Sequence, residues 1–292
     1  FALFYANGNT DRDYARGPNT ATSWVADATT ETFAAFTQMT YDVTDTTHVD
    51  AGLRFNHERI SAGFQNTTVG AAQPANNATC LVQCTGKASD DQITYKVALR
   101  QDLTDAIMLY GSYATGYKGQ GYDISTGFTP ARAANPVRPE TSNAYEIGLK
   151  SRFLDNRVQL NVTGFWTDFK NFQAQAQVTL ADGTIIPQLS NVGALRSRGV
   201  EAELSAKPTR LLRFDASAAY TDAKIRDFAN APCYTGQTVA QGCNRVGNAS
   251  LQDLSGDRLA NAPKFKYNIA ATQDIELPKM AFDGFITAEF AH

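Results

Sequence analysis

The sequence of 292 residues has no apolar run of eighteen residues, and its mean hydropathy is −0.32. Because a helix that crosses a bilayer needs about 20 mostly apolar residues, the sequence excludes a transmembrane helix. A membrane barrel stays open, because barrel strands alternate lipid-facing and lumen-facing side chains and their mean hydropathy is unremarkable. Aromatic residues make up 11% of the chain, with 17 Phe and 12 Tyr, as the interface girdles of a barrel require. Composition alone does not reject a soluble all-β protein.

The sequence also lacks an excess of charge and the histidines that catalytic motifs need. Lys and Arg number 26 and Asp and Glu number 29, so the net charge of −3 indicates no nucleic-acid partner. The histidines, His48, His57 and His292, lie outside any H-E-x-x-H motif. Residues Gly116–Gly121 resemble a phosphate loop superficially, but no helix pattern follows them. The sequence therefore predicts no catalytic residue, no metal site and no cofactor, and we do not expect an enzyme.

The few cysteines form two local pairs, Cys80 with Cys84 and Cys233 with Cys243, in stretches rich in Gly, Asn and Gln. A C-x3-C spacing suits a metal ligand pair, but no histidine lies near either pair to complete a site. Four cysteines allow three pairings, and we favour the local one. We therefore predict two short-range disulfides that staple exposed loops, as expected in an oxidising compartment.

Apolar and polar residues alternate in the stretch Arg138–Phe172. Its first run places Tyr145, Ile147 and Leu149 on one face and Glu146, Gly148 and Lys150 on the other. A polar break at residues 154–157 precedes a second alternating run over residues 158–166. Alternation at period two indicates a strand between two different environments, and the short break predicts an antiparallel hairpin. Each arm of about ten residues is long enough to cross a bilayer core at the usual barrel tilt.

The same pattern predicts about eleven strands in an all-β chain, with connections of two kinds. Short turns are expected near residues 44, 104, 155, 209 and 280. The other connections are predicted as loops of roughly twenty to forty residues, including a polar loop up to about Thr29 and a small hairpin at Asp182-Gly183. Compact soluble domains rarely carry five such loops, whereas outer-membrane barrels combine short periplasmic turns with long extracellular loops. We therefore expect both cysteine loops outside the cell.

Four stretches carry a family resemblance. RPETSNAYEIGLKSRFLDNRVQLNVTGFWTDFKNF, residues 138–172, resembles a barrel hairpin of the TonB-dependent outer-membrane receptors. In that hairpin, Pro-Glu-Thr precedes Tyr-Glu-x-Gly-x-Lys, a short turn and an aromatic-rich return strand. Three more stretches agree in order and rough spacing, namely YGSYATGYKGQGYD (110–123), NVGALRSRGVEAEL (191–204) and LSGDRLANAPKFKYN (254–268).

The resemblance implies a twenty-two-stranded transmembrane barrel filled by an N-terminal plug. An odd set of eleven strands cannot close as bacterial single-chain barrels do. We therefore expect residues 1–292 to be an internal segment, a partial barrel domain without the plug, the TonB box and the C-terminal strands. The resemblance also implies an integral protein of the bacterial outer membrane, in contact with its lipid, with the TonB complex and with a small-molecule ligand such as an iron chelate.

The implied function is capture of a scarce nutrient and uptake driven by TonB, with a ferric siderophore as the first expectation. Cobalamin, haem and oligosaccharide uptake are alternatives, as are a passive porin-like channel and a soluble β module. His57 and Glu58, near the outer end of a strand, are interpreted as solvated polar residues, with contact to a ferric ligand as the alternative.

The polar residues of the alternating strands are expected to line the lumen, where they hold water and ion pairs and contact the plug. A Lys or Arg that points into lipid costs about 2–4 kcal/mol at the bilayer midplane. The i, i+2 carboxylates Glu201 and Glu203 fit this lining better than a glycosidase pair. The predicted lumen-facing residues are Arg54, Lys96, Arg100, Glu146, Lys150, Glu201, Glu203, Arg213 and Asp215.

Ligand recognition is expected in the outer loops, where aromatic rings and guanidinium groups grip an anionic or aromatic iron chelate by charge and stacking. The ordinary alternative for these residues is interface aromatics and solvated charges. The candidates are Tyr117, Tyr122, Phe128, Arg132 and Arg138.

Overall fold

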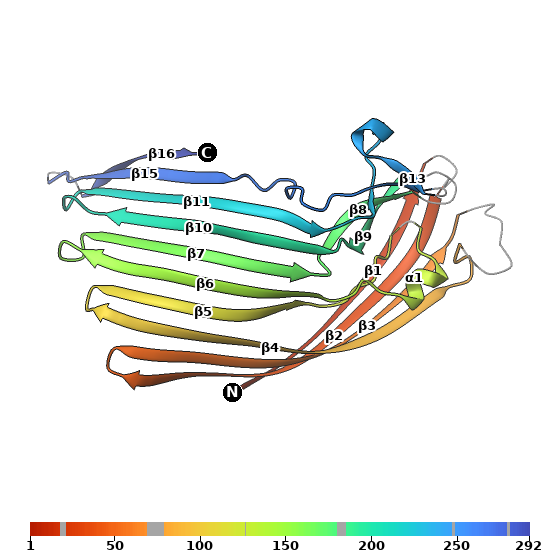
Figure 1. The fold of residues 1–292 in the computed structure, drawn as a ribbon, viewed down its shortest axis with the longest axis horizontal. Coiled ribbons are helices and arrows are strands. Elements are labelled where there is room, and N and C mark those ends of the chain that lie inside the picture. The colour runs from red at the N-terminus through yellow and green to blue at the C-terminus, as the bar shows by residue number, and fades with distance from the viewer. Residues whose placement is uncertain (18–21, 69–78, 126, 180–184, 247–248, 279–280) are drawn as a thin grey trace.

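The computed structural model describes residues 1–17, 22–68, 79–125, 127–179, 185–246, 249–278 and 281–292. Eleven strands form one antiparallel sheet in which each strand pairs with its neighbours along the chain (Figure 1). Its edge strands are β1 and β16, so the sheet is open. The predicted all-β barrel wall of about eleven strands is confirmed. The strands are β1 (Ala2–Arg16), β2 (Thr22–Thr44), β3 (Thr47–Asn66), β4 (Cys84–Thr104), β5 (Ile107–Lys118), β6 (Glu140–Phe153), β7 (Val158–Lys170), β10 (Ala194–Ala206), β11 (Leu212–Asp227), β15 (Phe265–Ile275) and β16 (Gly284–Ala291).

The five short turns lie where the alternation predicts them, all at one end of the sheet (Figure 1). The turn after β6 illustrates why they are short. Leu154, Asp155 and Asn156 have φ values of 51°, 53° and 65°. Asp and Asn tolerate this left-handed conformation better than other non-glycine residues. Arg157 N–H then donates to the Leu154 carbonyl at 3.1 Å and completes the turn.

The long connections meet at the opposite end, and here one prediction is wrong. In the described part of the polar stretch before Thr29, residues 6–16 and 22–28 are strand, not loop, because β1 pairs with β2 residue by residue as far as Arg16 with Thr22. Most of β1 is exposed, so its side chains show no apolar alternation. Ladder hydrogen bonds between two backbones need no buried face, and the periodicity therefore does not reveal this extension.

The other long connections hold small elements. The predicted hairpin is β8 (Gln173–Thr179) with β9 (Ile185–Asn191), while Asp182-Gly183 itself lies outside the described residues. A helix, α1 (Pro130–Ala134), interrupts the loop after β5. A second sheet combines β12 (Ala231–Pro232), β14 (Ala249–Gln252) and β13 (Asn244–Val246), with a short 3₁₀ helix, η1 (Val239–Gln241). In the described part of the chain, no helix has the length and apolarity to span a membrane.

Candidate functional site

The main sheet has one face of exposed apolar side chains. Cross-strand partners share a face, so the pairs Ile147–Gly164, Gly164–Val200 and Val200–Tyr220 place one register row on the same side of β6, β7, β10 and β11. The four residues of this row are uncharged, and Ile147 is 61% exposed. A contiguous apolar surface of this kind marks contact with a membrane or a partner. We call it the apolar face; its exposed members also include Leu53, Val97, Leu99, Leu204, Phe214, Ile269 and Phe290.

An aromatic row borders the apolar face at the long-loop end. Tyr113 pairs with Tyr145, and Tyr145 pairs with Trp166. The Tyr113 ring lies 4.9 Å from Tyr145 and 5.7 Å from Tyr95. Such belts of Tyr and Trp are typical of the boundary between the hydrocarbon and the headgroups.

The opposite face of the sheet carries the charges predicted to line the lumen. Lys96 pairs with Gly52, and Glu146 pairs with Ser112, so the charged positions of successive strands fall in register on one side. We call this the polar face. The structure brings all nine candidates to it, namely Arg54, Lys96, Arg100, Glu146, Lys150, Glu201, Glu203, Arg213 and Asp215.

Two hollows in the polar face are lined by six of these nine side chains. The larger, of about 520 Å³, is lined by Lys96, Arg100, Glu146 and Lys150 together with Asp50. Within it, Arg100 Nε lies 2.7 Å from Asp50 Oδ2. The smaller hollow, of about 290 Å³, includes Glu203 and Asp215 in its lining. Arg54 lies apart from both, with its guanidinium 5.6 Å and 5.3 Å from the rings of Phe4 and Phe36. These hollows are polar and hydratable, so the face suits water rather than lipid.

At the long-loop end, the polar face is covered by a small hydrophobic core. Trp24 and Phe64 come from the outer parts of β2 and β3, and their rings lie 5.4 Å apart. Phe128, from the loop between β5 and β6, packs 5.2 Å from Phe64. Since Ala26 pairs with Phe64 on the side that also carries Arg54, this loop folds over the polar face and not over the apolar one. We call it the loop core; its buried members are Trp24, Ala26, Ala62, Phe64, Cys80, Cys84, Ile124, Phe128 and Ala133.

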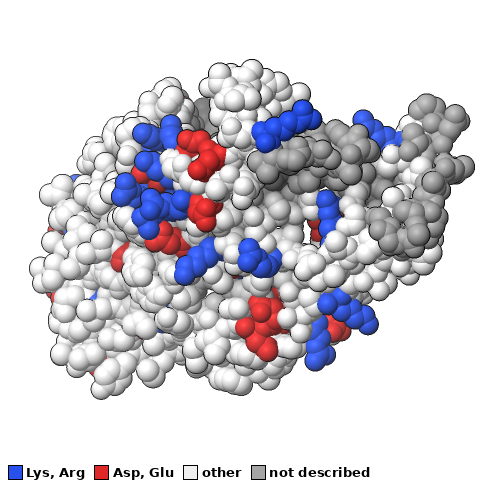
Figure 2. Space-filling view, turned by 45° about the vertical axis from the view of Figure 1, so that its right-hand side comes forward, with Lys and Arg blue, Asp and Glu red and all other residues white. Residues whose placement is uncertain are grey.

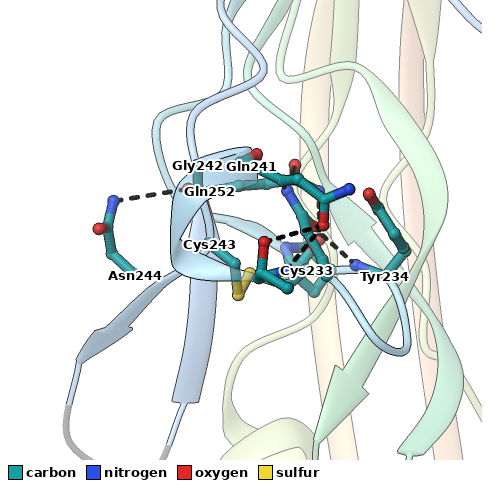
Figure 3. Close-up of a disulfide and its surroundings, with 10 residues drawn as sticks. Cys233, Tyr234, Gln241, Gly242, Cys243, Asn244 and Gln252 are labelled. Carbon is teal, nitrogen blue, oxygen red and sulfur yellow. Dashed lines mark hydrogen bonds between the residues drawn. A yellow bond between two sulfur atoms is a disulfide. The ribbon is translucent and has the colours of Figure 1, made fainter.

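The structure pairs Cys80 with Cys84 and Cys233 with Cys243, which is the local pairing. Cys80 and Cys84 are themselves buried in the loop core, 0% and 6% exposed, although Val82 in the turn that they close is 61% exposed. Figure 3 shows the second bridge, where Gln241, Gln252 and Tyr234 surround the two sulfur atoms. Across the ranges that the structure describes, no group of three or more His, Cys, Asp or Glu side chains is placed to hold a metal.

The candidate ligand residues gather around the loop core in different environments. Phe128 is only 2% exposed, so its ring supports the loop instead of facing solvent. The Tyr122 ring lies 6.4 Å from Phe128. Arg132 donates from Nη2 to Gln188 Oε1 at 2.6 Å, which ties the loop to β9. Arg138 is exposed and uses its backbone N–H, which donates to Asn191 Oδ1 at 2.8 Å.

Some buried polar atoms of this loop have no hydrogen-bond partner among the described residues. The Tyr122 hydroxyl and Arg132 Nη1 are buried and have no hydrogen-bond partner within the described residues. Burial raises the pKa of the Tyr122 hydroxyl and lowers the pKa of the Arg132 guanidinium. Arginine still remains charged at neutral pH. The loop therefore presents a neutral phenol and a cation, each with unused hydrogen-bonding capacity.

The fifth candidate, Tyr117, lies at the outer end of β5. Its hydroxyl donates to Glu58 Oε2 at 2.9 Å and to Asp90 Oδ2 at 3.2 Å. Glu58 is 9% exposed, so the interpretation of Glu58 as a solvated residue is wrong. Its neighbour His57 points to the other side, where Nδ1 lies 2.6 Å from Asp91 Oδ1.

Gln173 joins the two loops that follow β5 and β7, and the sequence pattern does not single it out. Its backbone N–H donates to Glu140 Oε2 at 2.7 Å. Its amide Nε2 donates to the carbonyls of Gly119 and Arg138 at 2.8 Å and 3.0 Å. A glutamine in a run of Gln and Ala carries no periodic signal, so only the three-dimensional contact reveals this role.

Charges at the loop end alternate in sign. On the face that it displays, Figure 2 shows Lys and Arg side chains beside Asp and Glu rather than a field of one sign. This agrees with the balanced composition and with a ligand held by local contacts instead of bulk attraction.

Comparison with known proteins shows to which family the chain belongs. A family model described as TonB dependent receptor-like, beta-barrel, matches residues 2–287. The chain belongs to the TonB-dependent receptors. This is a family of outer-membrane transport proteins and not of enzymes. The predicted family membership is confirmed.

This TonB-dependent receptor chain is similar to the pesticin receptor of Yersinia pestis, with 32% identity over 60% of the chain and 23% of that protein. It is 25% identical to the probable TonB-dependent siderophore receptor PiuA of Acinetobacter baumannii, over 87% of the chain and 30% of PiuA. The crystal structure of the ferric yersiniabactin uptake receptor FyuA from Yersinia pestis superposes with a TM-score of 0.71 at 22% identity, covering 99% of the chain and 38% of FyuA. That likeness concerns the fold. The chain spans less than two fifths of the length of each of these relatives.

Proposed function

We propose that residues 1–292 form part of an outer-membrane receptor that imports an iron chelate, with a ferric siderophore as the cargo. The family supports receptor-mediated transport. The relatives support the cargo, because PiuA is named as a siderophore receptor and FyuA as a ferric yersiniabactin uptake receptor.

The observation that carries the proposal is the division of one sheet into an apolar and a polar face. In a barrel the apolar face contacts lipid and the polar face lines the lumen. The nine charged side chains then avoid the bilayer, where a single Lys or Arg at the midplane would cost about 2–4 kcal/mol. The short turns lie on the periplasmic side and the long loops outside the cell.

We place the ligand contacts on the loops that cover the polar face at the outer mouth. The open hydrogen-bonding atoms of Tyr122 and Arg132 suit an anionic or acceptor-rich chelate. Tyr117 and Arg138 lie at the two ends of the same connection between β5 and β6. Phe128 contributes by holding the loop, through its contact with Phe64.

Transport requires a plug domain and the TonB complex in this proposal. Residues 1–292 supply a partial barrel domain, and the charged hollow around Lys96, Arg100, Glu146 and Lys150 is the surface that contacts the plug. Exposed charges that pair only partly within the sheet are suited to such a contact.

The test is uptake of radiolabelled metal, iron in the chelates and haem and cobalt in cobalamin, by cells that lack their own receptors for these ligands and express the full-length protein. A panel of ferric phenolate, catecholate and hydroxamate chelates is compared with haem and cobalamin, with and without a functional TonB complex. We expect TonB-dependent uptake of one ferric chelate. Uptake that persists without TonB indicates a passive channel and contradicts the proposal, as does uptake of haem or cobalamin alone.

A further inference from the structure

The aromatic row of the apolar face continues into charged residues on β10 and β11. Trp166 of β7 pairs with Arg198 of β10, and Arg198 pairs with Asp222 of β11. The next row toward the loops contains Asp168, Arg196 and Lys224, again in register. We call these six residues the tryptophan–arginine patch: Trp166, Asp168, Arg196, Arg198, Asp222 and Lys224. It lies on the same side of the sheet as Ile147 and Val200, directly beyond the apolar rows.

Two guanidinium groups of the patch share one indole. The Arg196 guanidinium lies 4.3 Å and that of Arg198 lies 5.1 Å from the Trp166 ring. Arg196 is further fixed by Asp168, to which Nε and Nη2 donate at 2.6 Å and 3.1 Å. Trp166 Nε1 donates to the same carboxylate at 2.9 Å. Both arginines are therefore ordered before any ligand arrives, which lowers the entropic cost of binding.

One carboxylate of the patch, Asp222, lies beneath its cations, whereas Asp168 is about as exposed as Arg196, 32% against 28%. The Asp222 side chain is 10% exposed, whereas its partners Arg198 and Lys224 are 48% and 43% exposed. One carboxylate thus serves two cations, with distances of 3.2 Å to Arg198 and 3.9 Å to Lys224. Lys170 adds another cation one row further out. With Arg196, Arg198 and Lys224 set against Asp168 and Asp222, the patch carries one net positive charge before Lys170 is counted.

We propose that the tryptophan–arginine patch binds the phosphate of a membrane lipid headgroup in the outer leaflet. The proposal rests on the membrane placement given above, in which Trp166 lies at the boundary of the hydrocarbon. Headgroup phosphates are found at the depth of such aromatic residues, and basic side chains there attract them. In both arginines Nε and Nη2 donate to a carboxylate, Asp168 or Asp222, and the N–H groups of Nη1 remain for a phosphate.

The test uses the full-length receptor, purified in a neutral detergent and freed of lipid. Binding of lipid A, which carries phosphates, is measured by native mass spectrometry and compared with binding of lipid A from which the phosphates have been removed. Inorganic phosphate is added in a separate series as a competitor. The variant is the double substitution Arg196→Gln and Arg198→Gln. The matched control is Arg210→Gln, because Arg210 is also exposed and paired with a carboxylate, Glu276, but lies at the short-turn end.

We expect the double variant to bind lipid A at least tenfold more weakly, while Arg210→Gln binds it like the unaltered receptor. The melting temperature of each variant in detergent shows that the barrel is intact. Equal lipid A binding by the double variant would overturn the proposal. So would equal binding of dephosphorylated lipid A by the unaltered receptor, or displacement of lipid A by millimolar inorganic phosphate, which would assign the patch to a soluble anion.

Lipid binding by the patch does not depend on which cargo the receptor imports. Iron uptake is measured on the same variants, and the double variant is expected to transport the chelate when it reaches the membrane. Loss of lipid binding with normal uptake supports the patch, and failure of uptake in the unaltered receptor tests only the proposed function.

Discussion

The loop between β5 and β6, which packs on the buried Cys80–Cys84 bridge, and the loop closed by Cys233–Cys243 are stabilised by different forces. Cys80–Cys84 is buried in the loop core, where rings from Trp24, Phe64 and Phe128 stack in sequence. Cys233–Cys243 lies beside the small sheet of β12, β13 and β14, and the turn that it closes exposes Tyr234 by 54% and Val239 by 74%. The first loop is positioned by apolar burial, and the second by a cross-link and hydrogen bonds.

This difference bears on the ligand site. A loop with its own core keeps one position over the polar face, because moving it would expose several aromatic rings at once. The second loop loses little apolar contact when it moves, so its covalent closure and its hydrogen bonds are what restrict it. The comparison predicts opposite sensitivities of the two loops to core truncation and to reduction.

The largest effect is expected from Phe128→Ala. Removing a buried Phe costs about 3–5 kcal/mol, and here the loss falls on the local opening of the loop rather than on the barrel. Hydrogen exchange of the segment around α1 should accelerate by several orders of magnitude, with the main strands unchanged. Val239→Ala is the matched control in the second loop, and it should leave exchange unaltered. Unchanged protection around α1 would mean that the loop core does not hold this loop.

Next in size is the loss of the second disulfide through Cys233→Ser with Cys243→Ser. Closing a loop of about fifteen residues contributes about 3 kcal/mol in the chain-entropy view, and this bridge closes a somewhat shorter one. Limited proteolysis should therefore cut between residues 234 and 242 in the variant but not in the oxidised protein. Cys80→Ser with Cys84→Ser should leave residues 119–134 protected, because the aromatic rings of the loop core remain. The comparison would be reversed if the Cys→Ser pairs increased cleavage of the first loop more than that of the second.

The main sheet is well predicted from the sequence because the two faces of its strands differ in polarity. Tyr145, Ile147 and Leu149 alternate with Glu146 and Lys150, and the structure places these sets on opposite faces. The extension of β1 escapes prediction because most of its side chains are exposed. In the paired part of β2, Trp24 and Ala26 are buried by the loop core, a contact that the local sequence does not reveal.

The ligand site is less predictable from sequence than the wall. Aromatic loop residues could be picked out, but whether a ring faces a ligand or a core depends on distant partners, as Phe128 and Phe64 show. Glu58 and Gln173 acquire their roles from contacts across 59 and 54 residues of sequence, with Tyr117 and Gly119 respectively. No local pattern encodes such contacts.

A smaller effect is expected from Gly119→Ala in the first loop. A Cβ at this position would collide with the Glu58 carboxylate, which Tyr117 already holds. Such overpacking costs about 1–3 kcal/mol and should loosen the outer end of β5, as seen by faster amide exchange of Tyr117 and Lys118. Gly121→Ala provides the control, because its Cβ would meet nothing within 4 Å. Equal exchange in the two variants would show that the close approach to Glu58 does not fix the loop.

The smallest effect concerns pH in the second loop. Hydrogen bonds from Ser255 lower the pKa of Asp253, and Asp253 Oδ1 accepts from the Ser255 N–H at 2.8 Å. Ser255 Oγ in turn accepts from the Phe228 N–H at 3.0 Å, so the carboxylate helps to fix the base of this loop.

Because the folded pKa of Asp253 is lowered, its stabilisation is fully present above the ordinary carboxyl pKa of about 4 and is lost as pH falls through the lowered value. Exchange of the Ser255 and Phe228 amides, corrected for intrinsic rates, should therefore accelerate only in acid. In Asp253→Asn this acid step should disappear, since the amide does not titrate. Amides around α1, which depend on apolar packing, should show no such step, and an equal acid step in both loops would remove the distinction between them.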